Sequence, residues 1–412
     1  MNDVYIVGIG ATPLGKHLDR TVKSLCLEAV TAALTDASLE IEDIQAAWFS
    51  NTRQGILEGQ NTIRGQCSLR SMGFAGIPMV NVENACASGS TAAREALAHI
   101  KAGFCDIALV VGAEKMFFPD KQDQMLKAFV GGTDVYDLDA LRSRLGEFSG
   151  EPDDGTGMSD LTTRSIFMDI YAAVARGHMK RYGTTVGQIA AAAAKNHHHS
   201  TFNPLSQYRT DMSVSQVLQD RPIVYPLTRS MCAPISDGAA AVILCSDLVA
   251  RRIGKARSVK LASISLRSSS DRAVDDLDAQ IGRLAALDAY KQASIAPEDV
   301  DVAEVHDACS FAEILQIENL GLCPRGQGGP FTETGATALG GKVPVNPSGG
   351  LVSKGHPVGA TGLYQYHELV TQLRGEAGRR QVDDARCAVA ENGGGFWGVE
   401  EAATTVSVLL RN

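Results

Sequence analysis

Short, continuously apolar segments alternate with longer segments of helical spacing along most of the chain. The apolar segments MVNVENA (79–85) and DIALVVGAE (106–114) enclose a helical pattern over residues 88–102, and SDGAAAVILCS (236–246) is typical of a buried strand. Buried strands that alternate with helices are characteristic of α/β proteins whose sheets are largely parallel. The pattern therefore predicts an α/β fold.

One stretch of this pattern occurs twice. AVTAALTDASLEIEDIQAAWF (29–49) and AALDAYKQASIAPEDVDVAEV (285–305) both predict the end of a helix, a turn and a buried strand, and seven residues are identical at the same offset of 256 positions. Each copy is preceded by a strand-like run, DVYIVGIG in the first and SVKLASISL in the second. Two strands and a helix in the same order favour an internal duplication over a chance match.

The alternation is lost between the two copies. This region contains an acidic, turn-rich stretch, FSGEPDDGTGMSD (148–160), and helical patterns at 163–181 and 185–200. We interpret it as a long insertion over the end of the sheets, where α/β proteins bind ligands. The expected units are an N-terminal half, a loop domain and a C-terminal half, covering 1–115 with 231–257, 116–230, and 258–412.

Size and composition are those of a globular protein of two or three structural units, with 412 residues, 44% of them hydrophobic and 21% charged. The formal net charge of −9 argues against a nucleic acid or an anionic membrane as partner. No apolar run is long enough to cross a bilayer. Nine scattered cysteines without a C-x-x-C pair indicate reduced thiols, so we expect a cytoplasmic protein.

Cys86 lies in VENACASGS (82–90), between a β-branched run and a row of very small residues. The local pattern predicts a strand, a tight turn and then a helix, so the thiol would face unpaired helix amides that favour the thiolate. The segment taken alone is equally consistent with a small cysteine that fills a close crossing of two elements. On local grounds Cys86 is therefore either a nucleophile or a packing residue.

Three further motifs offer partners for a thiol. His356 lies among glycines in NPSGGLVSKGHPVGATG (346–362), where the backbone can approach a ligand and an imidazole can accept a proton. His306 follows a buried strand, and Gly393 opens the triplet in AVAENGGGFWG, whose amides can face a developing negative charge. Each also has a structural reading: a satisfied core histidine, a residue beside a helix cap, or a plain glycine turn.

The run KNHHHSTFNP (195–204) is not expected to bind a metal. Three consecutive histidines cannot all face one ion on a regular helix, and no cysteine or acidic residue has a matching spacing. We expect partly buried histidines in a loop at the end of a helix, and no metal site in the protein.

Taken together, these motifs resemble the thiolase superfamily over essentially the whole chain. ENACASGS is similar to its nucleophile turn, and GGLVSKGHPVGATG to its glycine–histidine–proline signature. VHDACSFAE and AAKNHHHSTFNPLSQYR are similar to the branch of sterol-carrier-protein-type thiolases and lipid-transfer-protein homologues. The resemblance implies a thiolase fold of two duplicated α/β halves in five layers, α-β-α-β-α, with an inserted loop domain and usually a dimer.

The resemblance also implies roles for the site residues. Cys86 would be acylated, His356 would take its proton and help to stabilise a thioester oxyanion, and His306 would bind that oxyanion from the other side. The amides of Cys86 and Gly393 would form a second oxyanion hole for the acyl-enzyme. No cofactor would be bound permanently, and coenzyme A would be a cosubstrate that usually contacts the insertion.

The sequence departs from the family pattern at the acid/base residue. A typical thiolase has a second cysteine two residues before the glycine run, where this chain has Glu391. The sterol-carrier branch can instead carry it third in a His-Asp-Cys-Phe motif, where this chain has Ala308 followed by Cys309. Glu391 is the first candidate for the proton shuttle, because a partly desolvated carboxylate can reach a suitable pKa. Cys309 is the second.

Three functions follow as hypotheses. The leading one is acyl transfer on acyl-CoA and 3-ketoacyl-CoA thioesters through acyl-Cys86, by thiolytic cleavage or Claisen-type condensation, in lipid degradation. The second is a carbon–carbon lyase of the retro-aldol type, or an acyltransferase subunit that works with a small zinc-containing OB-fold partner. The third is a non-catalytic scaffold subunit. The expected partners are acyl-CoA, coenzyme A and a second copy of the chain.

Overall fold

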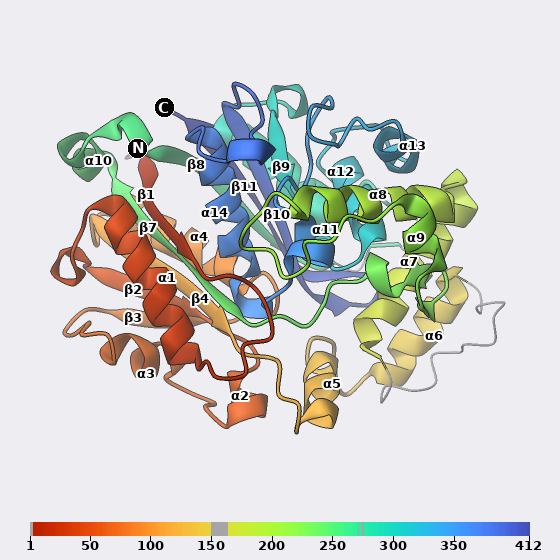
Figure 1. Ribbon diagram of the computed structural model, residues 1–412, viewed down its shortest axis with the longest axis horizontal. Helices are drawn as coiled ribbons and strands as arrows, with labels where there is room; N and C mark the ends of the chain where they lie inside the picture. Colours follow the sequence, from red (N-terminus) through yellow and green to blue (C-terminus); the bar gives the residue numbers. More distant parts are fainter. Residues whose placement is uncertain (1–2, 150–163, 271, 274–275) are drawn as a thin grey trace.

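A computed structural model describes residues 3–149, 164–270, 272–273 and 276–412 (Figure 1). Most of the acidic stretch at 148–160 lies outside these residues. In the described part of the chain, no helix is both long and apolar enough to span a membrane. Strands and helices alternate in both halves, which confirms the α/β class.

The N-terminal half contains five strands in the order β3-β2-β4-β7-β1. β2 pairs in parallel with β3 and β4, whereas β7 is antiparallel to both β4 and β1. The elements are β1 (Val4–Ala11), α1 (Val22–Ala37), β2 (Ala46–Ser50), α2 (Gln54–Glu58), α3 (Arg64–Arg70), β3 (Met79–Val82), α4 (Ser88–Lys101), β4 (Ile107–Glu114), β7 (Gly238–Ser246) and α10 (Asp247–Ile253).

The C-terminal half contains four strands in the order β8-β11-β10-β9. Its elements are β8 (Val259–Ser268), α11 (Ile281–Ala293), β9 (Val302–Glu304), α12 (Ser310–Asn319), α13 (Gly328–Glu333), α14 (Thr361–Leu373), β10 (Cys387–Trp397) and β11 (Glu400–Arg411). β1 and β8 pair through Tyr5 with Lys260 and Ile6 with Val259, so the two halves share one nine-stranded sheet.

The expectation of largely parallel sheets is wrong, because the sheet is mixed. β10 and β11 are joined by a two-residue turn, and a connection that short can only link antiparallel strands. β7 enters its half from the loop domain rather than from a crossover helix, and it runs antiparallel to both neighbours.

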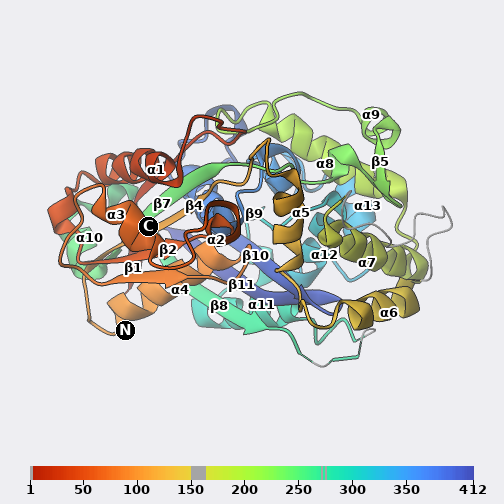
Figure 2. The same ribbon diagram turned by 90° about the horizontal axis from the view of Figure 1, so that it is seen from below.

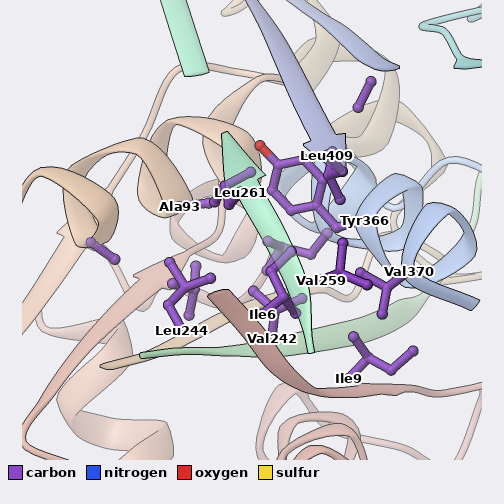
Figure 3. Close-up of a cluster of buried hydrophobic side chains, with 14 of the residues drawn as sticks. Ile6, Ile9, Ala93, Val242, Leu244, Val259, Leu261, Tyr366, Val370 and Leu409 are labelled. Carbon is purple, nitrogen blue, oxygen red and sulfur yellow. The ribbon is translucent and has the colours of Figure 1, made fainter. Parts of the chain in front are cut away.

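The two halves of the sheet and the helices that cover them form five layers, and three apolar clusters hold these layers together. The central cluster joins α4 and α14 to the inner faces of both halves, and Figure 3 shows part of it, including Ile6, Leu261 and Tyr366. One outer cluster packs α1 against β1 and β7, and the other packs α11 against β8 and β11. Side chains along β1 alternate between the inner and outer clusters, as a sheet with two covered faces requires. The predicted α-β-α-β-α stacking is confirmed.

The internal repeat is visible in the backbone. α1 and α11 both end on a serine in the left-handed conformation, Ser38 with φ 53° and Ser294 with φ 58°. A 3₁₀ turn follows each serine, at Ile41–Asp43 and Pro297–Asp299, and then a buried strand. All of these features recur at the offset of 256 residues read from the sequence, which supports the duplication.

The insertion between β4 and β7 is mainly helical in its described part. It contains α5 (Gln122–Val130), α6 (Leu138–Ser149), α7 (Ile166–Tyr182), α8 (Val186–Ser200), α9 (Val214–Gln219), β5 (Pro222–Val224) and β6 (Leu227–Thr228). Figures 1 and 2 show α6–α9 on the side of the molecule away from α1 and α10. Their apolar cluster includes Phe311 and Phe396, so the insertion packs on the C-terminal half. The unit boundaries at residues 115, 230 and 257 stay predictions.

Candidate active site

Cys86 lies in a tight turn between β3 and α4, as the sequence pattern predicts. Ala85 adopts a φ of +47°, a conformation that a non-glycine residue holds only when its surroundings enforce it. The turn is closed by the amide of Ala87, which donates to the Asn84 carbonyl at 3.0 Å, and by the amide of Ser88, which donates to the Ala85 carbonyl at 3.1 Å. Cys86 is therefore held at the start of a helix in a strained turn.

The glycine run of β10 closes over this turn. A Cβ on Gly394 would lie 2.2 Å from the Asn84 carbonyl oxygen and 2.6 Å from the Ala87 nitrogen, so no side chain fits there. The amide of the next residue, Gly395, donates a hydrogen bond to the Cys86 sulfur. The glycine triplet is thus a close backbone approach to the thiol rather than a plain turn.

Cys86, His306 and His356 meet although they lie in different parts of the chain. Their sulfur and ring nitrogen atoms all fall within 4.8 Å of one another. The two imidazoles are 5.1 Å apart between ring centroids and inclined at 78°. Among the described residues, these three form the one group of cysteine, histidine and acidic side chains placed closely enough to share a metal ion. The expectation of no metal site stays a prediction.

Hydrogen bonds give the two imidazoles opposite tautomers. The Thr361 hydroxyl donates to the Pro357 carbonyl at 3.1 Å, so it accepts from Nδ1 of His356 at 2.7 Å, and Nε2 of His356 carries the free lone pair. The Asn392 amide nitrogen donates to Nδ1 of His306 at 3.1 Å, which leaves the proton of His306 on Nε2. One imidazole can therefore accept a proton while the other donates a hydrogen bond.

Asn392 makes a second contact, with a hydroxyl that also lies 3.0 Å from the Ala87 carbonyl oxygen. Its Oδ1 accepts a hydrogen bond at 2.8 Å from Ser90 Oγ, at the start of α4, and Ser90 Oγ accepts in turn from the hydroxyl of Thr405 on β11 at 2.8 Å. All three residues are buried. These hydrogen bonds connect α4, the helix that follows Cys86, with the side chain of Asn392, which contacts Nδ1 of His306.

Burial dominates the protonation of the site. It raises the pKa of the Cys86 thiol to about 12, although the Arg53 charge and the Gly395 amide act in the opposite direction. It also lowers the pKa of His306 to about 3 and that of His356 well below its usual range. Desolvation of the sulfur therefore outweighs the helix amides, which the sequence predicts to favour the thiolate. At rest the site holds a neutral thiol beside two neutral imidazoles.

The two sequence-based candidates for the proton shuttle lie away from the cavity that contains Cys86. Glu391 is fully buried behind His306, whose backbone amide donates to its Oε2 at 2.9 Å. Burial and the nearby Glu401 raise the pKa of Glu391 well above its usual range. Cys309 is fully buried at the start of α12, whereas its neighbour Ala308 lines the cavity. A direct proton shuttle by Glu391 or Cys309 is thus not supported by their placement.

The cavity in front of Cys86 has a volume of about 530 Å³ and is bounded by both the loop domain and the C-terminal half. Most of its side chains are apolar, and Arg164, Arg229 and Glu401 are charged. The apolar part of the wall consists mainly of Met116, Leu126, Phe129, Phe167, Met168, Tyr171, Met212, Ile223 and Phe396. Gly393 also lines it, and its role in the oxyanion hole stays a prediction.

Sequence reasoning missed Glu401, which lines the cavity while 3% exposed. A signal was present: Glu400 and Glu401 open an otherwise apolar strand pattern, where a carboxylate must be paired or protonated. Nothing local distinguishes the two residues. Glu400 pairs with Arg272 at 2.6 Å, and Glu401 faces the cavity.

The three histidines of α8 point to separate partners. His197 hydrogen-bonds to the Ser230 carbonyl at 2.9 Å and lines the cavity, and His198 pairs with Asp211 at 3.0 Å. His199 is held between the Asn346 carbonyl and the Leu339 amide. They lie in the last turn of the helix rather than in a loop after it.

Comparison with known proteins adds to this geometry. A family model described as "Thiolase, N-terminal domain" matches residues 4–221, and one described as "Thiolase C-terminal domain-like" matches residues 263–409. The acetyl-CoA acetyltransferase of Methanothermobacter thermautotrophicus is 36% identical over 404 residues, which cover 97% of this chain and 98% of that protein. Sterol carrier protein 2 of Oryctolagus cuniculus is 35% identical over 406 residues, which cover 94% of this chain and 69% of that protein.

The fold also matches a solved structure described as "Ltp2-ChsH2(DUF35) aldolase". The match has a TM-score of 0.78 at 22% sequence identity and covers 99% of this chain and 98% of that chain. At that identity the likeness shows a shared fold.

Proposed function

Because the chain belongs to the thiolase family, we propose that it transfers acyl groups of coenzyme A thioesters through an acyl-Cys86 intermediate. The observation that carries this proposal is the meeting of a thiol with two neutral imidazoles of opposite tautomers. A nucleophile, a base and a hydrogen-bond donor at one point are the groups that attack on a thioester carbonyl requires.

The first step follows from the tautomers. Nε2 of His356 takes the proton of Cys86 as the sulfur bonds to the carbonyl carbon, so the thiolate forms only during attack. The carbonyl oxygen becomes an oxyanion and accepts a hydrogen bond from Nε2 of His306. Donors of this kind, held in place before the reaction, lower such a barrier by several kcal/mol. The amides of Cys86 and Gly393 take the second oxyanion position, on the acyl-enzyme.

The character of the cavity supports an apolar acyl group. Its volume of about 530 Å³ and its aromatic and methionine side chains suit an acyl chain or ring larger than acetyl. The relative from Methanothermobacter thermautotrophicus is named for acetyl-CoA, and we propose coenzyme A as the cosubstrate, with no cofactor bound permanently. We also keep as proposals a homodimer, a cytoplasmic location and a role in lipid degradation.

Intact-mass measurement tests the proposal. The protein is incubated with a panel of acyl-CoA thioesters of increasing chain length and ring content, and we expect a single acyl adduct. Cys86→Ala abolishes it, whereas Cys67→Ala, at a half-buried cysteine outside the cavity, keeps it. No adduct with any thioester of the panel would contradict the proposal.

A second candidate function is carbon–carbon cleavage of the retro-aldol type, with a small zinc-containing OB-fold protein as partner. Two observations favour it: the aldolase title of the structural neighbour, which names a DUF35 component, and the presence of Ala308 where the sterol-carrier branch can carry its acid/base cysteine. Retro-aldol cleavage needs no acyl-enzyme. Cleavage of a 3-hydroxyacyl-CoA by Cys86→Ala, with the candidate partner added, would select this function, and a protein that neither binds nor reacts with acyl-CoA would be a scaffold.

A further inference from the structure

We propose that Glu401 is the acid/base residue that exchanges protons with the α-carbon and the sulfur of the coenzyme A partner. The proposal rests on acyl transfer at Cys86 and assigns the group that replaces the usual second cysteine. Its starting point is the composition of the cavity wall. Among the described residues that line the cavity with Cys86, His306 and His356, Glu401 is the single carboxylate.

The β10–β11 hairpin holds Glu401 and the glycine run in one rigid ladder. Phe396 pairs with Glu401, and Gly393 with Thr404. A Cβ on Gly393 would lie 2.7 Å from Cγ of Glu401, so the absence of a side chain at 393 makes room for the carboxylate. Gly394, on the opposite face of the strand, contacts the nucleophile turn. The glycine run therefore lies between Cys86 and Glu401, and all of them line the same cavity.

The carboxylate is oriented from the side away from the cavity. Nε2 of Gln316 on α12 donates to its Oε1 at 2.9 Å. Tyr171 on α7 lies across the cavity, and Glu401, Cys309 and Cys86, in that order after burial, raise the pKa of its hydroxyl well above the usual range. Glu401 and Cys86 thus both lie close enough to this phenol to act on its pKa.

The surroundings of Glu401 give its carboxyl a pKa at which it can change its charge near neutral pH. The net pKa of Glu401 is raised to about 7: burial is the largest influence and the neighbouring Glu400 acts in the same direction, whereas its own backbone amide, Arg272 and the hydrogen bond from Gln316 act in the opposite direction. The nearby Glu391 on β10 has a pKa that burial raises well above its usual range. A carboxyl with a pKa near 7 can both give and take a proton at neutral pH, as an acid/base residue must.

The protons balance in the cleavage direction. The Cys86 sulfur bonds to the 3-keto carbon, the bond between the α- and β-carbons breaks, and its electron pair stays on the α-carbon of the departing thioester. The Glu401 carboxyl gives its proton to that carbon. The resulting carboxylate takes the thiol proton of coenzyme A, whose sulfur bonds to the acyl carbonyl as the bond to the Cys86 sulfur breaks. Glu401 returns to its starting form without a further reactant.

Deuterium exchange reports proton transfer at the α-carbon, which formation of the adduct from an acyl-CoA does not require. The protein is acylated in D₂O with the acyl-CoA that gives an adduct, and exchange at the α-carbon of excess acyl-CoA is followed by mass. We expect Glu401→Gln to reach the same final amount of adduct on Cys86, although more slowly because Glu401 also gives a proton to the departing coenzyme A sulfur, and to lose exchange by about 10²- to 10⁴-fold, the usual contribution of a positioned acid/base group. The retained adduct shows that the variant is folded.

Three further variants make the test specific. Glu401→Asp keeps the carboxylate one methylene shorter and should recover part of the exchange. Glu391→Gln removes a second buried carboxyl of the hairpin and should retain far more exchange than Glu401→Gln. Glu42→Gln, at an exposed carboxyl of the N-terminal half, should match the unmodified protein.

Exchange at the unmodified rate in Glu401→Gln overturns the proposal. So does loss of exchange in Glu391→Gln but not in Glu401→Gln, and so does an unmodified protein that forms the adduct without exchanging. Absence of any adduct would instead contradict acyl transfer itself, and the assignment of Glu401 would fall with it.

Discussion

The two halves of the molecule deliver different chemistry from equivalent positions. β2 ends at Ser50 and β9 is followed by His306, and these two residues stand 256 positions apart. Ser50 donates a structural hydrogen bond at 2.7 Å to the carbonyl of Gly359, in the loop after His356. His306 instead presents an imidazole to the cavity. The duplicated strand end thus supports the site in one half and forms part of it in the other.

The connections into the two central helices show the same divergence. Cys86 precedes α4 by a strained turn of a few residues, whereas His356 precedes α14 at the end of a longer, glycine-rich loop. Both helices begin beside the same cavity. The duplicated scaffold brings the first turns of α4 and α14 together. The loops before these helices differ, and this difference determines that the nucleophile precedes α4 and the base precedes α14.

The largest effect is expected from comparing a substitution at the catalytic base with one at the structural hydrogen bond of Ser50. His356→Asn removes the base that takes the Cys86 proton, and because burial holds the thiol neutral, we expect acylation to slow by about 10²- to 10⁴-fold. Ser50→Ala removes only the structural bond to Gly359 and should slow acylation far less. The rate of adduct formation, followed by mass, measures both. If both variants lost the same fraction of the acylation rate, His356 would contribute through the structure of the site and not as a base.

The next effect tests the tautomer of His306. Asn392→Leu removes the amide that holds Nδ1 as an acceptor and should lower the acylation rate by up to about 10²-fold, the cost of misplacing a reacting group. Thr405→Val, one contact further out, should have a smaller effect in the same direction. Activity in Asn392→Leu equal to that of the unmodified protein would show that His306 needs no orientation from β10.

The dependence on pH separates the two steps. Attack by Cys86 requires neutral His356 and His306, whose pKa values are lowered by burial, so these groups change the acylation rate little between about pH 6 and 8. The Glu401 carboxyl, which protonates the departing coenzyme A sulfur, makes acylation slower above the Glu401 pKa of about 7. Exchange at the α-carbon requires the Glu401 carboxylate, so it should rise about tenfold per pH unit below the pKa of about 7 and level off above it. Glu401→Gln should lose this rise. Identical profiles for both steps would contradict the division of labour.

The smallest effect concerns the close approach of β10 to the nucleophile turn. Gly394→Ala places a methyl against the Asn84 carbonyl and the Ala87 amide, so we expect the free energy of unfolding to fall by about 1–3 kcal/mol. Gly146→Ala, at an exposed helical glycine with open space, serves as the control and should be neutral or slightly stabilising. Denaturant unfolding compares the two. A neutral Gly394→Ala would show that the turn can move away.

Local features of the sequence determined the α/β alternation, the repeat, the helix ends at Ser38 and Ser294, and the strand–turn–helix at Cys86. They could be predicted because hydrophobic periodicity, turn residues and caps act over a few residues. The glycine–histidine–proline loop and the three glycines of β10 were also recognised, since those residue types suit close backbone approach.

Only the tertiary structure decided how these parts act. It brought His306 and His356 to within 4.8 Å of Cys86, buried the thiol so that it rests protonated, and turned Ala308 rather than Cys309 toward the cavity. It also distinguished Glu401 from Glu400, which the sequence could not do. Proximity across about 220 to 270 residues of chain, and the desolvation that sets each pKa, arise from the packing of whole layers rather than from any local pattern.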